Sequence, residues 1–271
     1  MICFPNCKIN LGLRILEKRT DGFHNLETVF LPLHLNDVLE IIETENKVEF
    51  STTGISIPET LDENICIKAF RILKNDFPNL PFLKMHLHKT IPLGAGLGGG
   101  SADAAFALKL INQKFELGIS IEQLKLYALQ LGSDCPFFIL NSPCFATGKG
   151  EKLTPIYLDL SAYKFILIYP QIHIKTQWAF SKIKCSSSEK SINEIIKQPI
   201  ETWKVELQND FEEPIFTTHP ELKKIKQNLY DAGATYAAMS GSGSTIFGIF
   251  KKEEKIDLHF PSNYFVKELV C

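Results

Sequence analysis

The sequence lacks the features that mark several large classes of protein. Its 271 residues carry 29 Lys and Arg against 31 Asp and Glu, a net charge of −2, whereas a general nucleic-acid binder is expected to be basic. No apolar run approaches the roughly 20 residues that a membrane-spanning helix needs, and the first residues show neither the basic start nor the apolar core of a signal peptide. We therefore expect neither nucleic acid nor membrane as a partner, and a globular chain that acts in the cytoplasm.

Paired cysteines are missing as well. The seven cysteines are irregularly spaced, none forms a Cys-x-x-Cys pair, and Cys66, Cys135 and Cys144 lie inside apolar stretches. This usage is typical of buried thiols in a reducing compartment, not of disulfides or a zinc site. We expect no metal site built from side chains alone.

What the sequence does have is a dense glycine loop at Pro92–Ala105, Pro-Leu-Gly-Ala-Gly-Leu-Gly-Gly-Gly-Ser-Ala-Asp-Ala-Ala. Five of the chain's 16 glycines fall between Gly94 and Gly100, and such density indicates a place where side chains would obstruct something. An alanine-rich stretch with helical spacing follows at 104–111. A glycine loop before a helix N-terminus presents free N–H groups and a positive dipole end, which favours phosphate. The alternative is a structural turn without a ligand.

Three familiar phosphate loops differ from this one. Its Gly-x-Gly-x-x-Gly spacing fits the dinucleotide pattern, but that loop follows a buried parallel strand, whereas residues 83–90 alternate like a partly exposed antiparallel strand. A Walker A loop needs a lysine directly before its serine, and here Gly100 precedes Ser101. The protein-kinase loop needs downstream His-Arg-Asp and Asp-Phe-Gly motifs, which are absent. The loop has no lysine of its own, so Lys8 or Mg²⁺ must supply positive charge.

The N-terminal segment predicts a strand with one polar face. Apolar residues alternate with polar residues and glycine from 7 to 15, which is typical of a half-buried strand. Lys8 and Asn10 then lie side by side on the polar face. The pair Asp21-Gly22 predicts a hairpin turn within 19–24.

Strand and helix signals alternate along the rest of the chain. Asp62 is expected to cap one helix, Ser120 and Gln123 form a capping box for another, and Gly233 ends a third. A second glycine-serine loop at 239–245 leads into an apolar strand, and residues 182–200 form a polar excursion. We expect strands near 27–35, 38–43, 48–51, 83–90, 164–169 and 246–250, and helices near 63–75, 102–112, 120–132 and 220–232. A domain boundary is expected near 152–162.

The glycine loop resembles the central motif of the GHMP kinases, which phosphorylate galactose, homoserine, mevalonate and related substrates. Met239–Gly248 resembles the C-terminal motif of that family. Pro5–Leu13, Arg19–Leu26 and Gly132–Phe138 resemble the branch of the family that acts on a cytidine diphosphate-linked methylerythritol in the non-mevalonate isoprenoid pathway. These motifs cover nearly the whole chain in order.

The resemblance implies an α+β fold of two domains. A ribosomal-protein-S5-like N-terminal domain would cover 1–155 and a ferredoxin-like C-terminal domain would cover 156–271. It also implies ATP and Mg²⁺ as cofactors and transfer of the γ-phosphoryl to the 2-hydroxyl of the methylerythritol moiety. The partners would be small molecules, and the chain would be a monomer or a weak homodimer.

Lys8 and Asp134 match the catalytic pair of the family. Asp134 would accept or orient the proton of the attacking hydroxyl, and Lys8 would hold Asp134 ionised and stabilise charge on the transferring phosphoryl. From the residues alone, the better interpretation of Asp134 is a turn aspartate that bonds its own backbone, and that of Lys8 is an ordinary solvated lysine.

The resemblance also assigns substrate contacts. His24 would read the cytosine ring by hydrogen bonds, Phe23 would stack on one face of it and Phe180 on the other, and Asn10 would bond the sugar alcohol or ribose. Phe23 stands where the family commonly has Tyr, which keeps stacking and loses a hydroxyl contact. A surface histidine and a core phenylalanine are the alternatives for His24 and Phe180.

The ATP side is implied to comprise the glycine loop and one helix start. Ser101 is the N-cap candidate and a candidate contact for phosphate or Mg²⁺. Asp103 is either a metal ligand or, as we prefer, an acidic residue of the first helical turn. Residues 239–245 are either a lid or floor near the phosphates or only a tight turn. The implied ATP-binding residues are Pro92, Leu93, Gly94, Ala95, Gly96, Leu97, Gly98, Gly99, Gly100, Ser101 and Ala102, with Asn64 and Ile65, which are otherwise a simple helix start.

Three rival functions remain. Another GHMP kinase with a smaller alcohol substrate would need no base-reading loop such as Phe23-His24. A Rossmann dehydrogenase would need an acidic residue at the end of a second strand about 20 residues past the loop, which is missing. A non-catalytic nucleotide-binding module would not need Lys8 and Asp134.

Overall fold

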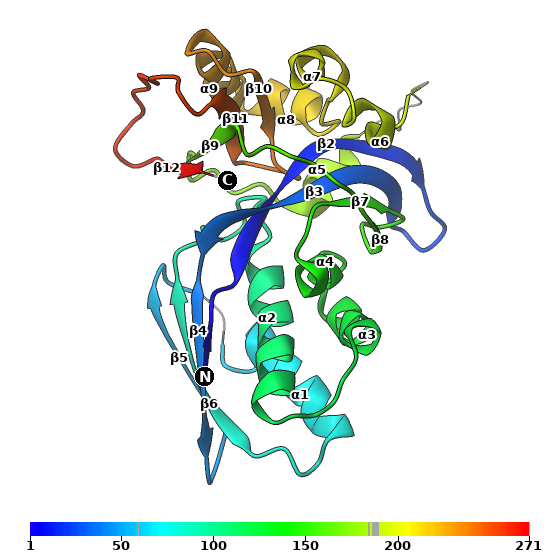
Figure 1. The fold of residues 1–271 in the computed structure, drawn as a ribbon, viewed down its shortest axis with the longest axis vertical. Helices are drawn as coiled ribbons and strands as arrows, with labels where there is room; N and C mark the ends of the chain where they lie inside the picture. Colours follow the sequence, from blue (N-terminus) through cyan, green and yellow to red (C-terminus); the bar gives the residue numbers. More distant parts are fainter. Residues whose placement is uncertain (59, 184, 186–189, 271) are drawn as a thin grey trace. The chain divides into compact units, whose positions relative to one another are not determined.

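The computed structural model describes residues 1–58, 60–183, 185 and 190–270. These residues form two compact units, neither of which is one continuous stretch (Figure 1). Unit 1 comprises 1–7, 35–93 and 98–142; unit 2 comprises 8–34, 94–97 and 143–270. The expected domain boundary between 155 and 156 stays a prediction. No helix among the described residues is long and apolar enough to cross a membrane.

Unit 1 contains a four-stranded sheet with the order β1-β4-β6-β5. The predicted strand before the glycine loop is β6, which is partly exposed and pairs antiparallel with β4, as predicted, and parallel with β5. One face of this sheet carries the apolar side chains that the alternation predicts, including Leu39, Met85 and Leu87, all buried. The strands are β1 (Ile2–Cys3), β4 (Val38–Thr44), β5 (Glu49–Gly54) and β6 (Phe82–Lys89).

Four helices complete unit 1. The capping box of Ser120 and Gln123 is confirmed. The predicted cap at Asp62 was wrong: Asn64 is the N-cap, and its side chain accepts a hydrogen bond from the Cys66 N–H, because the helix begins two residues later than expected. The helices are α1 (Ile65–Asp76), α2 (Gly99–Lys114), α3 (Ile121–Leu131) and α4 (Cys135–Leu140).

Unit 2 contains two four-stranded sheets, ordered β2-β3-β7-β8 and β10-β11-β9-β12. The first is built on the predicted N-terminal hairpin, whose turn is closed by a hydrogen bond from the Arg19 N–H to the Phe23 carbonyl. The strands are β2 (Asn6–Lys18), β3 (His24–Asn36), β7 (Cys144–Thr147), β8 (Lys152–Pro155), β9 (Tyr163–Tyr169), β10 (Tyr236–Met239), β11 (Ile246–Lys251) and β12 (Phe265–Val270). The helices are α5 (Thr176–Ser181), α6 (Ile192–Ile195), α7 (Ile200–Glu206), α8 (Glu212–Thr218) and α9 (Pro220–Asp231).

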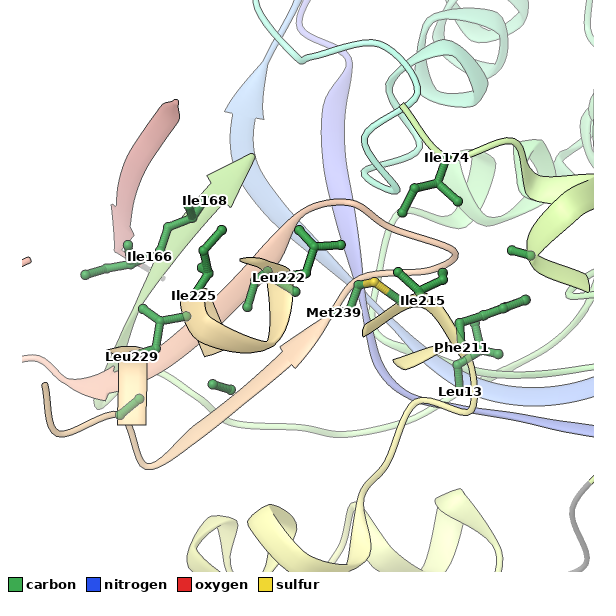
Figure 2. Packing of buried hydrophobic residues seen from close by; sticks show 14 of the residues in the cluster. Leu13, Ile166, Ile168, Ile174, Phe211, Ile215, Leu222, Ile225, Leu229 and Met239 are labelled. Atoms are coloured by element: carbon green, nitrogen blue, oxygen red, sulfur yellow. The ribbon is translucent and has the colours of Figure 1, made fainter. Parts of the chain in front are cut away.

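One apolar core ties β2 to the second sheet of unit 2. Figure 2 shows Leu13 of β2 beside Phe211 and Ile215, with Met239 close to them. The helix α9 contributes Leu222 and two further apolar residues, one turn apart, as its predicted amphipathic pattern requires. The core therefore fixes the strand that carries Lys8 and Asn10.

The described part of the polar excursion contains a short helix. Residues 184 and 186–189 lie outside the described residues, but 190–200 contain α6, which begins at a capping box of Ser191 and Glu194. The buried carboxylate of Glu27 accepts hydrogen bonds from the Ser191 hydroxyl (2.7 Å) and the Ile192 N–H (3.0 Å), and from Arg14 (2.7 Å). This carboxylate anchors the excursion to the hairpin.

Candidate active site

The glycine loop adopts a backbone that only glycine tolerates well. Gly94, Gly96 and Gly98 have φ of 62°, 79° and 70°, in the left-handed region. Gly98 is the N-cap of α2 and provides no side-chain cap, so the expectation that Ser101 is the N-cap was wrong: Ser101 is the third residue of the helix. Because glycine has no side chain, the N-cap residue cannot cap the first N–H groups of α2, and this arrangement suits an anionic ligand.

The second glycine-serine loop supports the first from within unit 2. The Ser240 hydroxyl donates to the Gly96 carbonyl (2.8 Å) and the Thr245 N–H donates to the Ala95 carbonyl (3.1 Å). A β-carbon at Gly96 would lie 2.2 Å from the Ser240 carbonyl oxygen. Residues 239–245 are therefore both a tight turn before β11 and a support beneath the glycine loop.

Lys8 and Asn10 lie next to these loops, but not on a solvated face as predicted. All of β2 from Asn6 to Ile15 is buried, and Lys8 is 4% exposed. Its ammonium donates to the Asn10 side-chain oxygen (2.6 Å) and lies 4.8 Å from the centre of the Phe30 ring. The expectation of a half-buried strand was wrong because the two loops cover its polar face. A buried ammonium needs hydrogen-bond acceptors, and the Asn10 side-chain oxygen is one.

The backbone of β2 continues this network. The Lys8 N–H donates to the Leu97 carbonyl (2.9 Å), and the Asn10 N–H donates to the Ser240 hydroxyl (3.3 Å). The Asn10 amide donates to the Thr28 hydroxyl (3.0 Å). Unit 2 thus brings together three predicted elements: the Lys8 strand, residues 94–97 of the glycine loop, and the second loop.

The predicted base-binding residues gather at the hairpin of unit 2. His24 and Phe180 stack on each other, with ring centres 4.9 Å apart and planes 18° apart. Burial, together with the charge of Lys18, lowers the pKa of His24, so its imidazole is neutral near pH 7. Phe23 is 56% exposed, and the ammonium of Lys149 lies 4.5 Å from the centre of its ring.

The remaining predicted residues belong to unit 1. Asp134 precedes α4 and makes no side-chain cap bond to that helix. The next residue, Cys135, is hydrogen-bonded by the side chain of Ser101, and burial raises the pKa of its thiol to about 12. Ser101 in the first turn of α2 is therefore tied to the start of α4, beside Asp134. The Asn64 side-chain oxygen is engaged by the α1 cap, and Ile65 is the first residue of that helix.

An ion cluster that the sequence analysis missed lies beneath the glycine loop in unit 1. The buried ammonium of Lys89 contacts both Asp37 and Asp103, with 2.7 Å to Asp103. Asp37 also accepts from the Thr90 N–H (2.6 Å) and the Ile91 N–H (2.9 Å). The preferred reading of Asp103 as a first-turn acidic residue was wrong, because its carboxylate is buried against Lys89.

Burial of this cluster changes the acidity of one member. Burial raises the pKa of Asp103 to about 8, against the opposing attraction of Lys89, and its second carboxylate oxygen has no hydrogen-bond partner. A signal was present in the sequence: Lys89 is in phase with Met85 and Leu87 on the buried face of β6, and a lysine there needs a carboxylate partner.

No group of three or more His, Cys, Asp or Glu that could hold a metal ion exists among the residues that the structure describes.

Two family models match the chain. The model for the GHMP kinases N terminal domain matches residues 64–142, and the model for the GHMP kinases C terminal matches residues 190–258. The first match includes the glycine loop and Asp134, and the second includes the second glycine-serine loop.

Curated relatives cover nearly the whole chain. A 4-diphosphocytidyl-2-C-methyl-D-erythritol kinase of Azobacteroides pseudotrichonymphae is 50% identical over 93% of this chain and 94% of its own length. A protein of the same name from Bacteroides fragilis is 49% identical over 94% of each chain.

Solved structures agree in fold. The crystal structure of a 4-(cytidine 5'-diphospho)-2C-methyl-D-erythritol kinase matches with a TM-score of 0.80 and 29% identity, covering 92% of this chain and 89% of that one. A homoserine kinase from Cytophaga hutchinsonii matches with a TM-score of 0.73 at 14% identity, covering 98% and 94%, which shows the shared fold alone.

Proposed function

Because the chain belongs to the GHMP kinase family, whose members are ATP-dependent phosphotransferases, we propose that it phosphorylates the 2-hydroxyl of 4-diphosphocytidyl-2-C-methyl-D-erythritol. The products would be the 2-phosphate and ADP, in the non-mevalonate route to isopentenyl diphosphate. The observation that carries this proposal is the identity of 50% to a relative of that name over 93% of the chain.

ATP binds by its phosphates at the glycine loop and the start of α2. Gly98 is the N-cap of α2, and the N–H groups at the start of a helix, here Gly98 to Ser101, have no carbonyl partner within the helix, so they are the donors offered to the phosphates. The residues Pro92 to Ala102 thus act as the phosphate cradle. Asn64 and Ile65 at the start of α1 contact the adenine side.

Lys8 and Asp134 carry the chemistry. The glycine loop has no lysine of its own. Lys8 lies on β2, and its backbone N–H donates to the Leu97 carbonyl of that loop. The Lys8 ammonium neutralises charge on the transferring phosphoryl. Asp134 accepts the proton of the 2-hydroxyl as that oxygen attacks the γ-phosphorus. The bond from the phosphorus to the β,γ-bridging oxygen then breaks, and ADP leaves.

Mg²⁺ would accompany ATP and neutralise part of its phosphate charge. Mg²⁺ commonly takes most of its ligands from phosphate oxygens and water, which suits a chain with no three-residue metal cluster among its described residues. The hydroxyl of Ser101 in the first turn of α2 is an oxygen that would reach such an ion.

The cytidine end of the substrate binds at His24, Phe23 and Phe180. Ring centres 4.9 Å apart leave no room for a third ring between His24 and Phe180. The cytosine therefore takes the place of the imidazole against Phe180, and the displaced His24, neutral at pH 7, donates to and accepts from the edge of the base. Phe23 stacks on the other face, and Asn10 bonds the sugar alcohol or ribose.

The cysteines bear on the cellular context of the chain. Six cysteines in the described part of the chain form no disulfide, which favours the reducing cytoplasm. We propose a monomer or a weak homodimer that recognises no nucleic acid, and domains that divide between 155 and 156.

The test is a coupled assay of ADP release with ATP, Mg²⁺ and the diphosphocytidyl methylerythritol. Turnover with this substrate, and none with homoserine or mevalonate, is the expected result. Turnover with a simple alcohol alone would replace the proposal with the second candidate, a GHMP kinase for a small alcohol. That candidate is favoured only by fold-level matches such as the homoserine kinase.

A further inference from the structure

A short segment that precedes α8, residues 207–211, lies along β2 in unit 2. The Leu13 N–H donates to the Gln208 carbonyl (2.9 Å), and the Asp210 N–H donates to the Leu13 carbonyl (2.8 Å). The carboxylate of Asp210 also accepts from the Ile15 N–H (2.8 Å). Between these bonds lies Asn209, which is 3% exposed.

The side chain of Asn209 holds the second glycine-serine loop. Its amide donates to the Met239 carbonyl (2.7 Å) and the Gly241 carbonyl (2.9 Å). Its oxygen accepts from the Phe211 N–H (2.9 Å). Both amide hydrogens therefore end on the loop, and the oxygen ends on the segment that is fixed to β2.

The loop that Asn209 holds is the one that supports the glycine loop. Ser240 lies between its two bonded carbonyls, and the Ser240 hydroxyl donates to the Gly96 carbonyl (2.8 Å). A β-carbon at Gly241 would lie 3.4 Å from the Asn10 side-chain oxygen and 3.5 Å from the Gly96 carbonyl oxygen. The backbone at 240–241 thus meets both the phosphate cradle and the strand of Lys8.

We propose that Asn209 is a positioning residue: by bonding the carbonyls of Met239 and Gly241, it fixes the position of the glycine-loop backbone at Gly96. This inference rests on the proposed binding of ATP phosphates at the glycine loop. Asn209 touches no substrate; it fixes Ser240, and Ser240 fixes Gly96. A side chain without donors at 209 releases the loop, so the phosphate-binding N–H groups lose their preset arrangement.

The test uses Asn209→Asp, which keeps the acceptor for Phe211 N–H but sets a carboxylate against two carbonyl oxygens. Asn209→Ser, which keeps one donor, is the milder variant should the first not fold. Tyr236→Phe is the matched control: the Tyr236 hydroxyl donates to the Leu207 carbonyl (2.8 Å) at the start of the same segment, and its ring packs against Trp203 and Phe247. Binding of ADP with Mg²⁺ is measured by calorimetry without acceptor, and unfolding by urea.

We expect Asn209→Asp to weaken ADP binding about tenfold or more, Asn209→Ser by less, and Tyr236→Phe by less than about twofold at a comparable loss of stability. ADP affinity that is unchanged in both Asn209 variants would overturn the inference, as would an equal loss in Tyr236→Phe. A second readout is coupling: Ser240→Ala combined with Asn209→Ala should cost less ADP affinity than the product of the single effects, because both act through one link. Independent, multiplying effects would also overturn it.

These outcomes separate this inference from the proposed function. A wild-type chain that binds ADP but does not phosphorylate the proposed acceptor would overturn the substrate and leave Asn209 testable. A wild-type chain that binds no ADP would overturn the nucleotide role of the glycine loop and the inference with it.

Discussion

The buried cluster under the glycine loop makes a quantitative prediction about pH. Lys89 shares one positive charge between two carboxylates, and the backbone N–H groups of Thr90 and Ile91 stabilise the carboxylate of Asp37. Burial raises the pKa of Asp103 to about 8; the charge of Lys89 opposes this rise and the charge of Asp37 adds to it. An unfolded aspartate has a pKa of about 3.9. Between these two values, the folded chain holds a proton that the unfolded chain has released.

The sign of the effect follows from this difference. Stability falls with rising pH wherever the folded state binds more protons, by about 1.4 kcal/mol per pH unit for one such group. From pH 6 to pH 8, where Asp103 is half ionised, the loss is about 2 kcal/mol. The figure is an upper bound, because a proton shared in a coupled cluster titrates over a broader range.

The perturbation is Asp103→Asn. Asparagine accepts the bond from Lys89 but cannot ionise, so the pH-dependent loss disappears while Lys89 and Asp37 remain a neutral pair. A burial cost of the new amide shifts the free energy of unfolding equally at every pH. We therefore expect the variant to gain about 2 kcal/mol on the wild type between pH 6 and pH 8, whatever its offset.

The assay is urea unfolding of both chains at pH 6, 7 and 8, followed by far-ultraviolet circular dichroism, because both tryptophans, Trp178 and Trp203, lie in unit 2. Asp257→Asn, at an aspartate whose side chain is 92% exposed, is the control and should track the wild type. Parallel pH profiles for Asp103→Asn and the wild type would refute the reasoning, because Asp103 would then be ionised throughout.

Further predictions concern the proposed reaction. Asp134→Asn should lower kcat by about 10²-fold or more with ADP affinity unchanged, checked by ADP release and calorimetry; near-normal kcat would remove it from proton transfer. Lys8→Met should also lower kcat about 10²-fold, since a transition-state charge loses its partner. Gly96→Ala should abolish ADP binding, because its methyl group meets the Ser240 carbonyl at 2.2 Å. The affinity for CDP should be constant from pH 8 to pH 7, because the lowered pKa of His24 keeps its imidazole neutral in this range. It should fall at lower pH as His24 is protonated, and an affinity that does not change with pH would contradict this.

Much of the local backbone structure could be predicted because its signals lie close together in the sequence. The glycine run, the Asp21-Gly22 turn and the Ser120 capping box each depend on residues within a few positions of one another, and the backbone conformation follows from their chemistry. Family motifs then supplied roles for Lys8 and Asp134 that spacing alone left open.

The remainder depends on contacts between distant residues. Lys89 was visible as a lysine in phase with buried leucine and methionine, but its partner Asp37 lies 52 residues away. The bond from Asn209 to Met239 spans 30 residues. The Asn64 cap was missed because Asp62 offers the same local signal two positions earlier, and only the helix start decides between them. Periodicity predicts which face is buried, but not which element buries it.

The order in which unit 2 is synthesised has a consequence of its own. Its β2 and β3 leave the ribosome well before their partners: Thr28 of β3 pairs with Ala146, and the Asn10 N–H of β2 donates to the hydroxyl of Ser240, 230 residues later. Such long-range pairing is slow to form and leaves strand edges exposed meanwhile. The contacts around Lys8 therefore form only after residues 239–245 have been synthesised, so we expect a stalled chain to lack them.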